Sequence, residues 1–149
     1  MELEKEIVQT NFKNIWQKAI INVMYTSNWI NAAHHEMLKT YELSTPQYNI
    51  LRILRGQHPK PATIRLLTQR MLDKMSNASR LVERLRIKGM VERDICASDR
   101  RQVHVRITDR GLELLRRIDA TMDEEAHQFE NITEEEAAEL SRILDKMRG

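Results

Sequence analysis

The chain has 149 residues, enough for one domain or for a small domain with additional helices for oligomerisation. Hydrophobic residues make up 41% and charged residues 31% of it, which is typical of a globular protein and argues against a disordered chain. The net charge of +2 is unevenly distributed, because Lys and Arg concentrate between residues 60 and 117 and Asp and Glu between 121 and 139. A basic segment beside an acidic one fits a nucleic-acid surface on one part of the molecule.

Several classes of protein are disfavoured by what the sequence lacks. One cysteine, Cys96, excludes an intramolecular disulfide and fits a reducing cytoplasm. The first residues do not form a signal peptide, and there is no run of about 18 uncharged apolar residues, so we expect a cytoplasmic protein without a membrane span. Without a glycine-rich phosphate loop, a nucleophile–base motif or metal-ligand spacing, we expect neither an enzyme nor a cofactor.

The N-terminal region, residues 3–38, has the apolar periodicity of one long helix. The periodic positions are Ile7, Phe12, Ile15, Ala19, Val23, Ile30 and Met37. Further apolar residues at Trp16, Ile20, Met24 and Trp29 make this stripe too broad for one packing partner. We therefore expect the helix to contact both its own domain and a second subunit.

Two shorter helices are predicted next from their capping residues. Ser44 is a good N-cap with Gln47 at the capping-box position and Pro46 in the first turn, and residues 56–61 end this helix. Its buried face is expected to contain Ile50, Leu51, Ile53 and Leu54. Thr63 can cap the following helix, whose inward residues would be Ile64, Leu67 and Met71.

A turn at 71–74 then leads to a helix predicted over residues 75–88, with Gly89 as a left-handed C-cap. Its core face would consist of Ala78, Leu81, Val82 and Leu85. Two strands follow, 90–93 and 103–107, the second alternating between apolar and polar residues, with a polar hairpin tip at 94–102. The order helix, turn, helix, strand, loop, strand outlines a winged helix-turn-helix.

The C-terminal part is predicted to be helical in two segments. The first begins at residues 108–111, with Leu112, Leu115, Ile118 and Met122 on one face. The second is preceded by a capping box of Thr133 with Glu136, and its inward residues would be Ala137, Leu140, Ile143 and Leu144. The expected fold is mainly α with a small two- or three-stranded wing (α+β). We divide it into an N-terminal dimerisation helix (1–40), a DNA-binding region (41–110) and C-terminal dimerisation helices (111–149), all within one structural domain.

The side chains on the second helix of this motif suit DNA. Short polar or basic residues near its start can read base edges in the major groove; these are Ser76, Asn77, Ser79 and Arg80. Arg84 and Lys88, further along, are placed to contact phosphates. At the hairpin tip, Arg100 and Arg101 can enter a minor groove, with Asp99 orienting one of them. The alternative for each segment is an ordinary solvated surface.

These residues resemble the MarR-type bacterial transcriptional regulators. The matching segments are 44–48, 76–85, 88–93, 99–101 with Val103 and Val105, and 107–111. The resemblance is close over about residues 40–115, although residues 71–75 are more apolar than the usual turn and the wing lacks a common proline. It implies a homodimer on a pseudo-palindromic, double-stranded operator, usually acting as a repressor that a small lipophilic or phenolic molecule, or an oxidant, releases. It also implies that the arginine at position 101 enters the minor groove.

Three further features concern what would switch such a regulator. Cys96 lies near the wing arginines, but the family's peroxide sensors have their cysteine near the start of the first long helix, so an incidental thiol is favoured. His34 and His35 point about 100° apart on a helix and form no metal-binding cluster with other residues, so no metal site is expected. An effector pocket could be lined by Trp29, His34, Met37 and Tyr41. The alternatives are a winged-helix dimer that binds a protein or ligand without sequence-specific DNA binding, and a redox-responsive regulator using Cys96.

Overall fold

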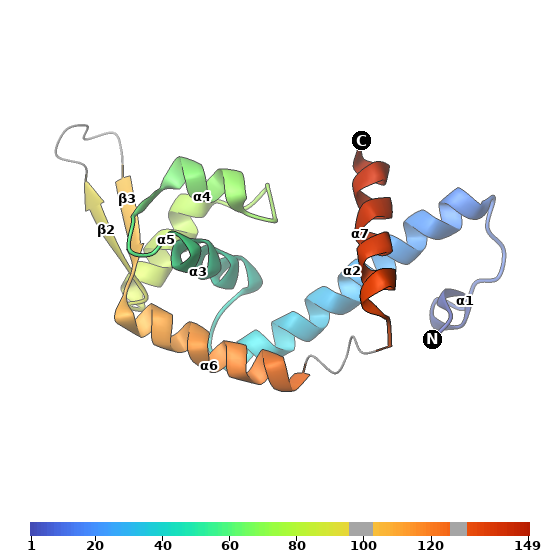
Figure 1. Cartoon of the computed structure of the whole chain (residues 1–149), viewed down its shortest axis with the longest axis horizontal. Coiled ribbons are helices and arrows are strands. Elements are labelled where there is room, and N and C mark those ends of the chain that lie inside the picture. Colours follow the sequence, from blue (N-terminus) through green and yellow to red (C-terminus); the bar gives the residue numbers. More distant parts are fainter. Residues whose placement is uncertain (96–102, 126–130) are drawn as a thin grey trace. The chain divides into compact units, whose positions relative to one another are not determined.

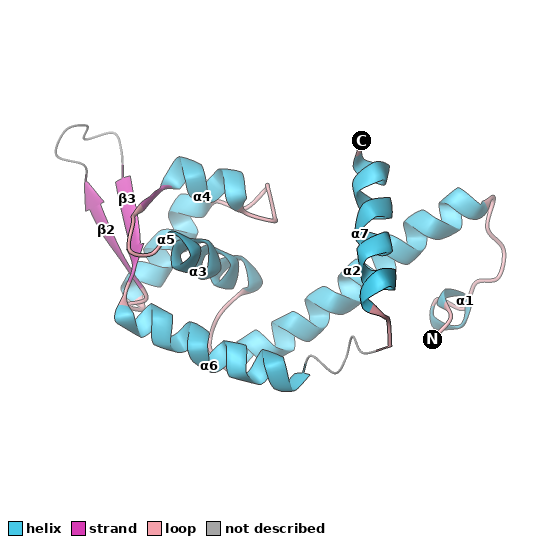
Figure 2. Cartoon of the chain, viewed as in Figure 1, coloured by secondary structure: helices cyan, strands magenta, loops and turns pink. Residues whose placement is uncertain are grey.

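The structure, a computed structural model, describes residues 1–95, 103–125 and 131–149 and is mainly helical over them (Figures 1 and 2). Its elements in chain order are α1 (Leu3–Glu6), α2 (Ile15–Lys39), α3 (Thr45–Gln57), β1 (Ala62–Thr63), α4 (Ile64–Arg70), α5 (Ala78–Ile87), β2 (Val91–Ile95), β3 (Val103–Ile107), α6 (Asp109–Glu125) and α7 (Glu134–Arg148). They group into two compact units, Met1–Leu112 and Glu113–Gly149. Among the described residues, no helix is long and apolar enough to cross a membrane.

Capping side chains determine where three helices begin, as the sequence predicts. The Ser44 hydroxyl accepts the Gln47 N–H at 3.4 Å, and the Gln47 side chain accepts the Ser44 N–H at 3.0 Å, which completes the capping box of α3. Thr63 caps α4 by accepting the Leu66 N–H at 3.2 Å. The predicted capping box before α7, Thr133 with Glu136, is also present.

The N-terminal helix differs from its prediction. Instead of one helix over residues 3–38, a single turn (α1) precedes a non-helical segment, and the long helix α2 begins only at Ile15. Val8 in that segment has a φ of 52°, which is incompatible with a continuous helix. Asn14 then caps α2, because its side chain accepts the Gln17 N–H at 2.9 Å. The prediction of one continuous helix is therefore wrong over residues 7–14.

The core of the first unit lies where α3 packs on α5 and on β3. Its fully buried side chains come from all of these elements and from α4 and β2. They include Ile50, Leu51, Leu54, Leu67, Val82, Leu85, Val91 and Val105. The predicted buried faces of the three helices in the winged module are thereby confirmed for these residues.

A three-stranded antiparallel sheet forms the wing side of this module, in the order β1–β3–β2. The hairpin pairs Val91 with Ile107 and Ile95 with Val103, and β1 adds Ala62 opposite Val105. The fold-class prediction is confirmed, with β1 as the third strand. Gly89, at φ +73°, ends α5 in the left-handed conformation, and the Met90 N–H bonds back to the Leu85 carbonyl, so β2 follows directly.

The helix α7, in the second unit, has no buried residue. Leu140 and Ile143, which the sequence places on an inward face, are 50% and 47% exposed. These residues share one apolar face of α7, but within the described part of the second unit they are not buried as the sequence predicts.

Close packing at Gly111 gives a first testable prediction. A Cβ there would press on the Met90 carbonyl oxygen and lie 2.7 Å from Cγ1 of Ile107, below the 3.0 Å that real Cβ contacts keep. Although Ala is the better helix former, we expect Gly111→Ala to lower the free energy of unfolding by about 1–3 kcal/mol, because the backbone must move. Urea unfolding at a fixed protein concentration measures this.

Gly56 provides the matched control, because it also lies in a helix and a Cβ there would meet nothing within 4 Å. Gly56→Ala is expected to raise the free energy of unfolding by about 0.5–1 kcal/mol. Equal effects of the two substitutions would contradict the close approach at Gly111.

Candidate nucleic-acid interface

The helix-turn-helix consists of α4, the turn over residues 71–77, and α5. The second helix begins at Ala78, three residues later than predicted, because Asp73 organises the preceding turn. Its carboxylate accepts the Met75 N–H at 2.9 Å and the Ser76 hydroxyl at 2.6 Å. These bonds, the hydroxyl first, hold the pKa of Asp73 below its usual value. Ser76 therefore lies in the turn rather than on the helix.

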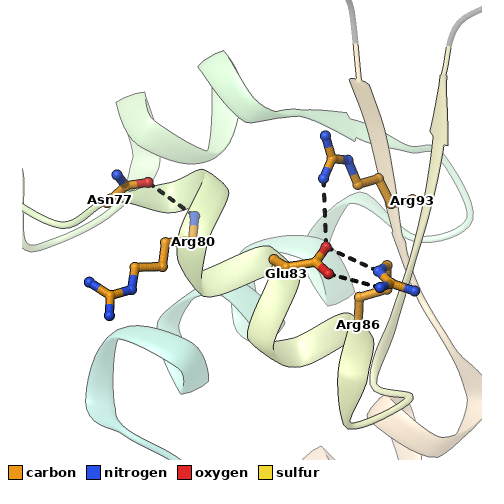
Figure 3. Close-up of polar contacts among 5 residues, drawn as sticks. All are labelled: Asn77, Arg80, Glu83, Arg86 and Arg93. Carbon is orange, nitrogen blue, oxygen red and sulfur yellow. Dashed lines mark hydrogen bonds and ion pairs between the residues drawn. The ribbon is translucent and has the colours of Figure 1, made fainter.

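Asn77 is the N-cap of α5 (Figure 3). Its Oδ1 accepts the backbone N–H of Arg80 at 3.0 Å. Bidentate reading of adenine uses the carbonyl oxygen and the amide nitrogen of asparagine together. Because the oxygen of Asn77 already serves the helix, its amide nitrogen is the atom that remains available for a base edge.

The exposed residues of α5 fall into two groups by charge. Ser79, Arg80 and Arg84 are exposed, and neither arginine has an acidic partner among the described residues. The Arg80 side chain points away from the Glu83 cluster (Figure 3). Arg80 and Arg84 are one helical turn apart, so they form a short basic stripe on one face of α5.

The second group is Glu83 with Arg86: the Glu83 carboxylate accepts hydrogen bonds from Nε and Nη2 of Arg86 at 3.0 and 2.8 Å (Figure 3). The same carboxylate lies 3.6 Å from Nη1 of Arg93 on β2. The Arg86 bonds lower the pKa of Glu83 and raise that of Arg86. Sequence reasoning did not assign this cluster, although the spacing of Glu83 and Arg86 is a usual signal for a helical ion pair.

Lys88, predicted to contact phosphate, has a partner within the chain. Its ammonium donates to the carbonyl oxygen of Glu42 in the loop between α2 and α3. The bond ties the end of α5 to that loop. A phosphate contact by Lys88 would therefore compete with this internal bond.

The tip of the wing, with Asp99, Arg100 and Arg101, lies outside the described residues, as does Cys96. The strands that lead to it are described, and they carry Arg93 and the exposed Arg106. Within the described part of the chain, no three His, Cys, Asp or Glu residues are grouped so as to hold a metal ion.

A groove of about 760 Å³ lies between α2, α3 and the turn before α5. Its lining comprises Ser27, Asn31, Ala32, His35, Thr45, Pro46, Asn49, Met71, Leu72 and Asp73. Asn49 Oδ1 accepts the Leu72 N–H at 2.9 Å, so a lining residue also holds the turn. Sequence reasoning did not identify these residues, although Thr45 and Asn49 are one helical turn apart on the polar face of α3.

The residues predicted for an effector pocket lie elsewhere. Met37 is buried, His34 and Tyr41 are half-buried, and Trp29 is exposed. None of the four lines the groove, whereas the adjacent His35 does.

Comparison with known proteins agrees with this arrangement. A model of the winged helix DNA-binding domain matches residues 43–111, which span α3 to the start of α6. The HTH-type transcriptional repressor IacR of Pseudomonas putida is 26% identical over 141 residues, which cover 94% of this chain and 80% of IacR.

Solved structures extend the similarity to most of the chain. An organohalide-sensing transcriptional regulator in its 2,4-dichlorophenol-bound form has a TM-score of 0.79 at 21% identity, covering 94% of this chain and 85% of its own. The MarR transcription factor of Planctomyces limnophilus is 30% identical, with a TM-score of 0.69 over 91% of this chain and 98% of its own. These proteins are regulators of transcription rather than enzymes. On this identity, coverage and shared winged helix, the chain belongs to the MarR family of DNA-binding transcriptional regulators.

Proposed function

We propose that this protein is a homodimeric, cytoplasmic repressor that binds a pseudo-palindromic operator and is released by a small lipophilic or phenolic effector. The observation that carries the proposal is the basic stripe on α5. Arg80 and Arg84 are exposed without an acidic partner among the described residues, at the reading end and the middle of the second helix of a helix-turn-helix. Recognition helices use these positions for base edges and phosphates.

Each DNA contact has a proposed role. Ser76, Asn77, Ser79 and Arg80 read the major groove; Asn77 contributes its amide nitrogen, and Ser79 and Arg80 are exposed in the first turn of α5. Arg84 and Lys88 contact phosphates, Lys88 after leaving the Glu42 carbonyl. At the wing, Arg100 and Arg101 enter the minor groove, with Asp99 orienting one of them.

Dimerisation is assigned to residues 1–40 and 111–149, and DNA binding to 41–110. The support for this division is the uncovered apolar surface of the terminal helices. On α2, Ile15, Trp16 and Met24 are exposed, and on α7 Leu140, Ile143 and Met147 are about half exposed. Large exposed apolar surfaces of this kind mark protein interfaces. A twofold dimer would place two α5 helices on half-sites about one turn of DNA apart.

The groove between α2, α3 and the turn is the proposed effector site. Its lining combines four apolar residues with six polar ones, Asn49 and His35 among them, so it offers both apolar contacts and hydrogen-bonding groups to a small ligand. A dichlorophenol is bound in one structural neighbour. An effector here would lie beside the turn that precedes α5, where it can alter the position of the reading end.

Operator selection from random DNA with the purified chain tests the DNA-binding proposal, and two arginine variants test the roles. Arg80→Ala is expected to relax preference at one base-pair position in each half-site, at a cost of about 1–3 kcal/mol. Arg84→Ala should weaken binding to all sequences about equally and lower the slope of log K against log salt by about one for each phosphate that the variant no longer binds. Fluorescence anisotropy at several salt concentrations gives both quantities.

Each arginine variant serves as the control for the other. If Arg80→Ala lowered the affinity for operator and for random DNA equally, Arg80 would be assigned to a phosphate contact instead of a base contact. Failure to recover a palindrome would favour a winged-helix protein without sequence-specific DNA binding.

The dimer proposal is tested on α7. Ile143→Asp should reduce the mass in solution from twice 17.6 kDa toward 17.6 kDa, because a carboxylate cannot be buried unpaired at the interface. Ala138→Asp is the control, since Ala138 is exposed about 140° around the helix from Ile143. Sedimentation velocity distinguishes them, and an unchanged mass for Ile143→Asp would remove α7 from the interface.

The effector proposal is tested by filling the groove. Ala32→Trp places a large side chain among the lining residues and should abolish release of the operator by phenolic acids and halophenols. Operator affinity without effector should stay within about twofold of the wild-type value. Release that persists in Ala32→Trp would place the effector elsewhere.

A further inference from the structure

Two large apolar side chains are exposed in the turn before α5. Leu72 is 86% and Met75 93% exposed. Leu72 lines the groove proposed as the effector site. Met75 does not line it, and within the described part of the chain nothing covers its side chain. A thioether side chain exposed to this extent is free to contact a binding partner, and its burial there would be favourable.

The backbone at Met75 is held in place. Its N–H donates to the Asp73 carboxylate at 2.9 Å, and the same carboxylate accepts the Ser76 hydroxyl at 2.6 Å. Asp73 is held in turn, because the preceding Leu72 N–H donates to Asn49 on α3 at 2.9 Å. Met75 is therefore presented from an ordered turn, two residues before the N-cap of α5.

The position of Met75 indicates what covers it. It lies two residues before Asn77, the N-cap at the reading end of α5, so a duplex that meets this end of the helix comes close to the turn that carries Met75. The only apolar group that a base edge presents in the major groove is the C5-methyl of thymine. A flexible, polarizable methionine side chain can adapt to such a methyl group.

We propose that Met75 is a specificity-determining residue that selects a thymine in each operator half-site through contact with its C5-methyl group. The inference rests on the proposed function, since it requires an operator. It adds an apolar contact from the turn to the polar contacts assigned to the helix.

The test replaces thymine with deoxyuridine, which removes only the methyl group. Each thymine of the selected operator is replaced in turn, at symmetric positions in both half-sites, and affinity is measured for the wild type and for Met75→Ala. At one thymine, replacement by deoxyuridine is expected to lower the affinity of the wild type about fourfold per half-site. This corresponds to the burial of one methyl group, about 0.8 kcal/mol. Met75→Ala should bind the thymine and deoxyuridine duplexes equally at that position.

Two other exposed apolar residues provide matched controls. Leu72→Ala alters the same turn, and Ile87→Ala alters the opposite end of α5, where Ile87 is 72% exposed. Both should keep the wild-type ratio between the two duplexes. Comparing ratios within each variant cancels any effect of deoxyuridine on DNA stiffness.

The outcomes separate this inference from the function on which it rests. Failure to select any operator overturns both. Selection of an operator with no thymine preference in the wild type, or with the same preference retained in Met75→Ala, overturns the role of Met75 and leaves the DNA-binding proposal intact. A preference that disappears in Leu72→Ala instead would assign the methyl contact to Leu72 and overturn the inference.

Discussion

The burial of one face of α5 is the constraint on which the arrangement of the candidate interface depends. Ala78, Val82 and Leu85 are buried against α3 and the sheet, so the rotation of the helix about its axis is determined. With 3.6 residues per turn, Arg80 and Arg84 must then lie on an outward face. The direction of these arginines thus follows from hydrophobic packing, and DNA is not needed to orient them.

If packing were the only constraint, every exposed arginine of α5 would be equally available to bind DNA. Glu83 makes them unequal. By pairing with Arg86 and lying near Arg93, it reduces the positive charge on the side of α5 toward β2. These pairs are about half exposed, so their contribution to stability is small. Their larger consequence is electrostatic, because the unpaired charge of the helix is limited to the stripe of Arg80 and Arg84. A narrower basic surface favours a defined register on DNA over diffuse attraction to phosphate.

Local signals in the sequence predicted most of the fold. Capping residues such as Ser44 and Thr133 act within four residues, and apolar periodicity identified the buried faces, so these elements were confirmed. The start of α5 was predicted three residues too early, because Asp73 and Asn77 form alternative local bonds that a hydrophobic pattern does not reveal.

The candidate site was only partly predictable. Its arginines follow from the helical period, but the groove depends on a hydrogen bond between Asn49 and a turn 23 residues away, and no local pattern encodes this contact.

The terminal helices show why one chain is not the functional unit in this proposal. An isolated helix of about 15 residues is marginal in water, and α7 has that length without a single buried residue. Its exposed ion pairs at i and i+3, such as Glu139 with Arg142, contribute little to its stability because solvent screens them. In the proposed dimer, burial of the apolar face of α7 in the second subunit would supply the missing stability. In such a dimer, dimerisation, ordering of α7 and the spacing of the two reading helices would form one coupled equilibrium, and the apparent operator affinity would depend on protein concentration.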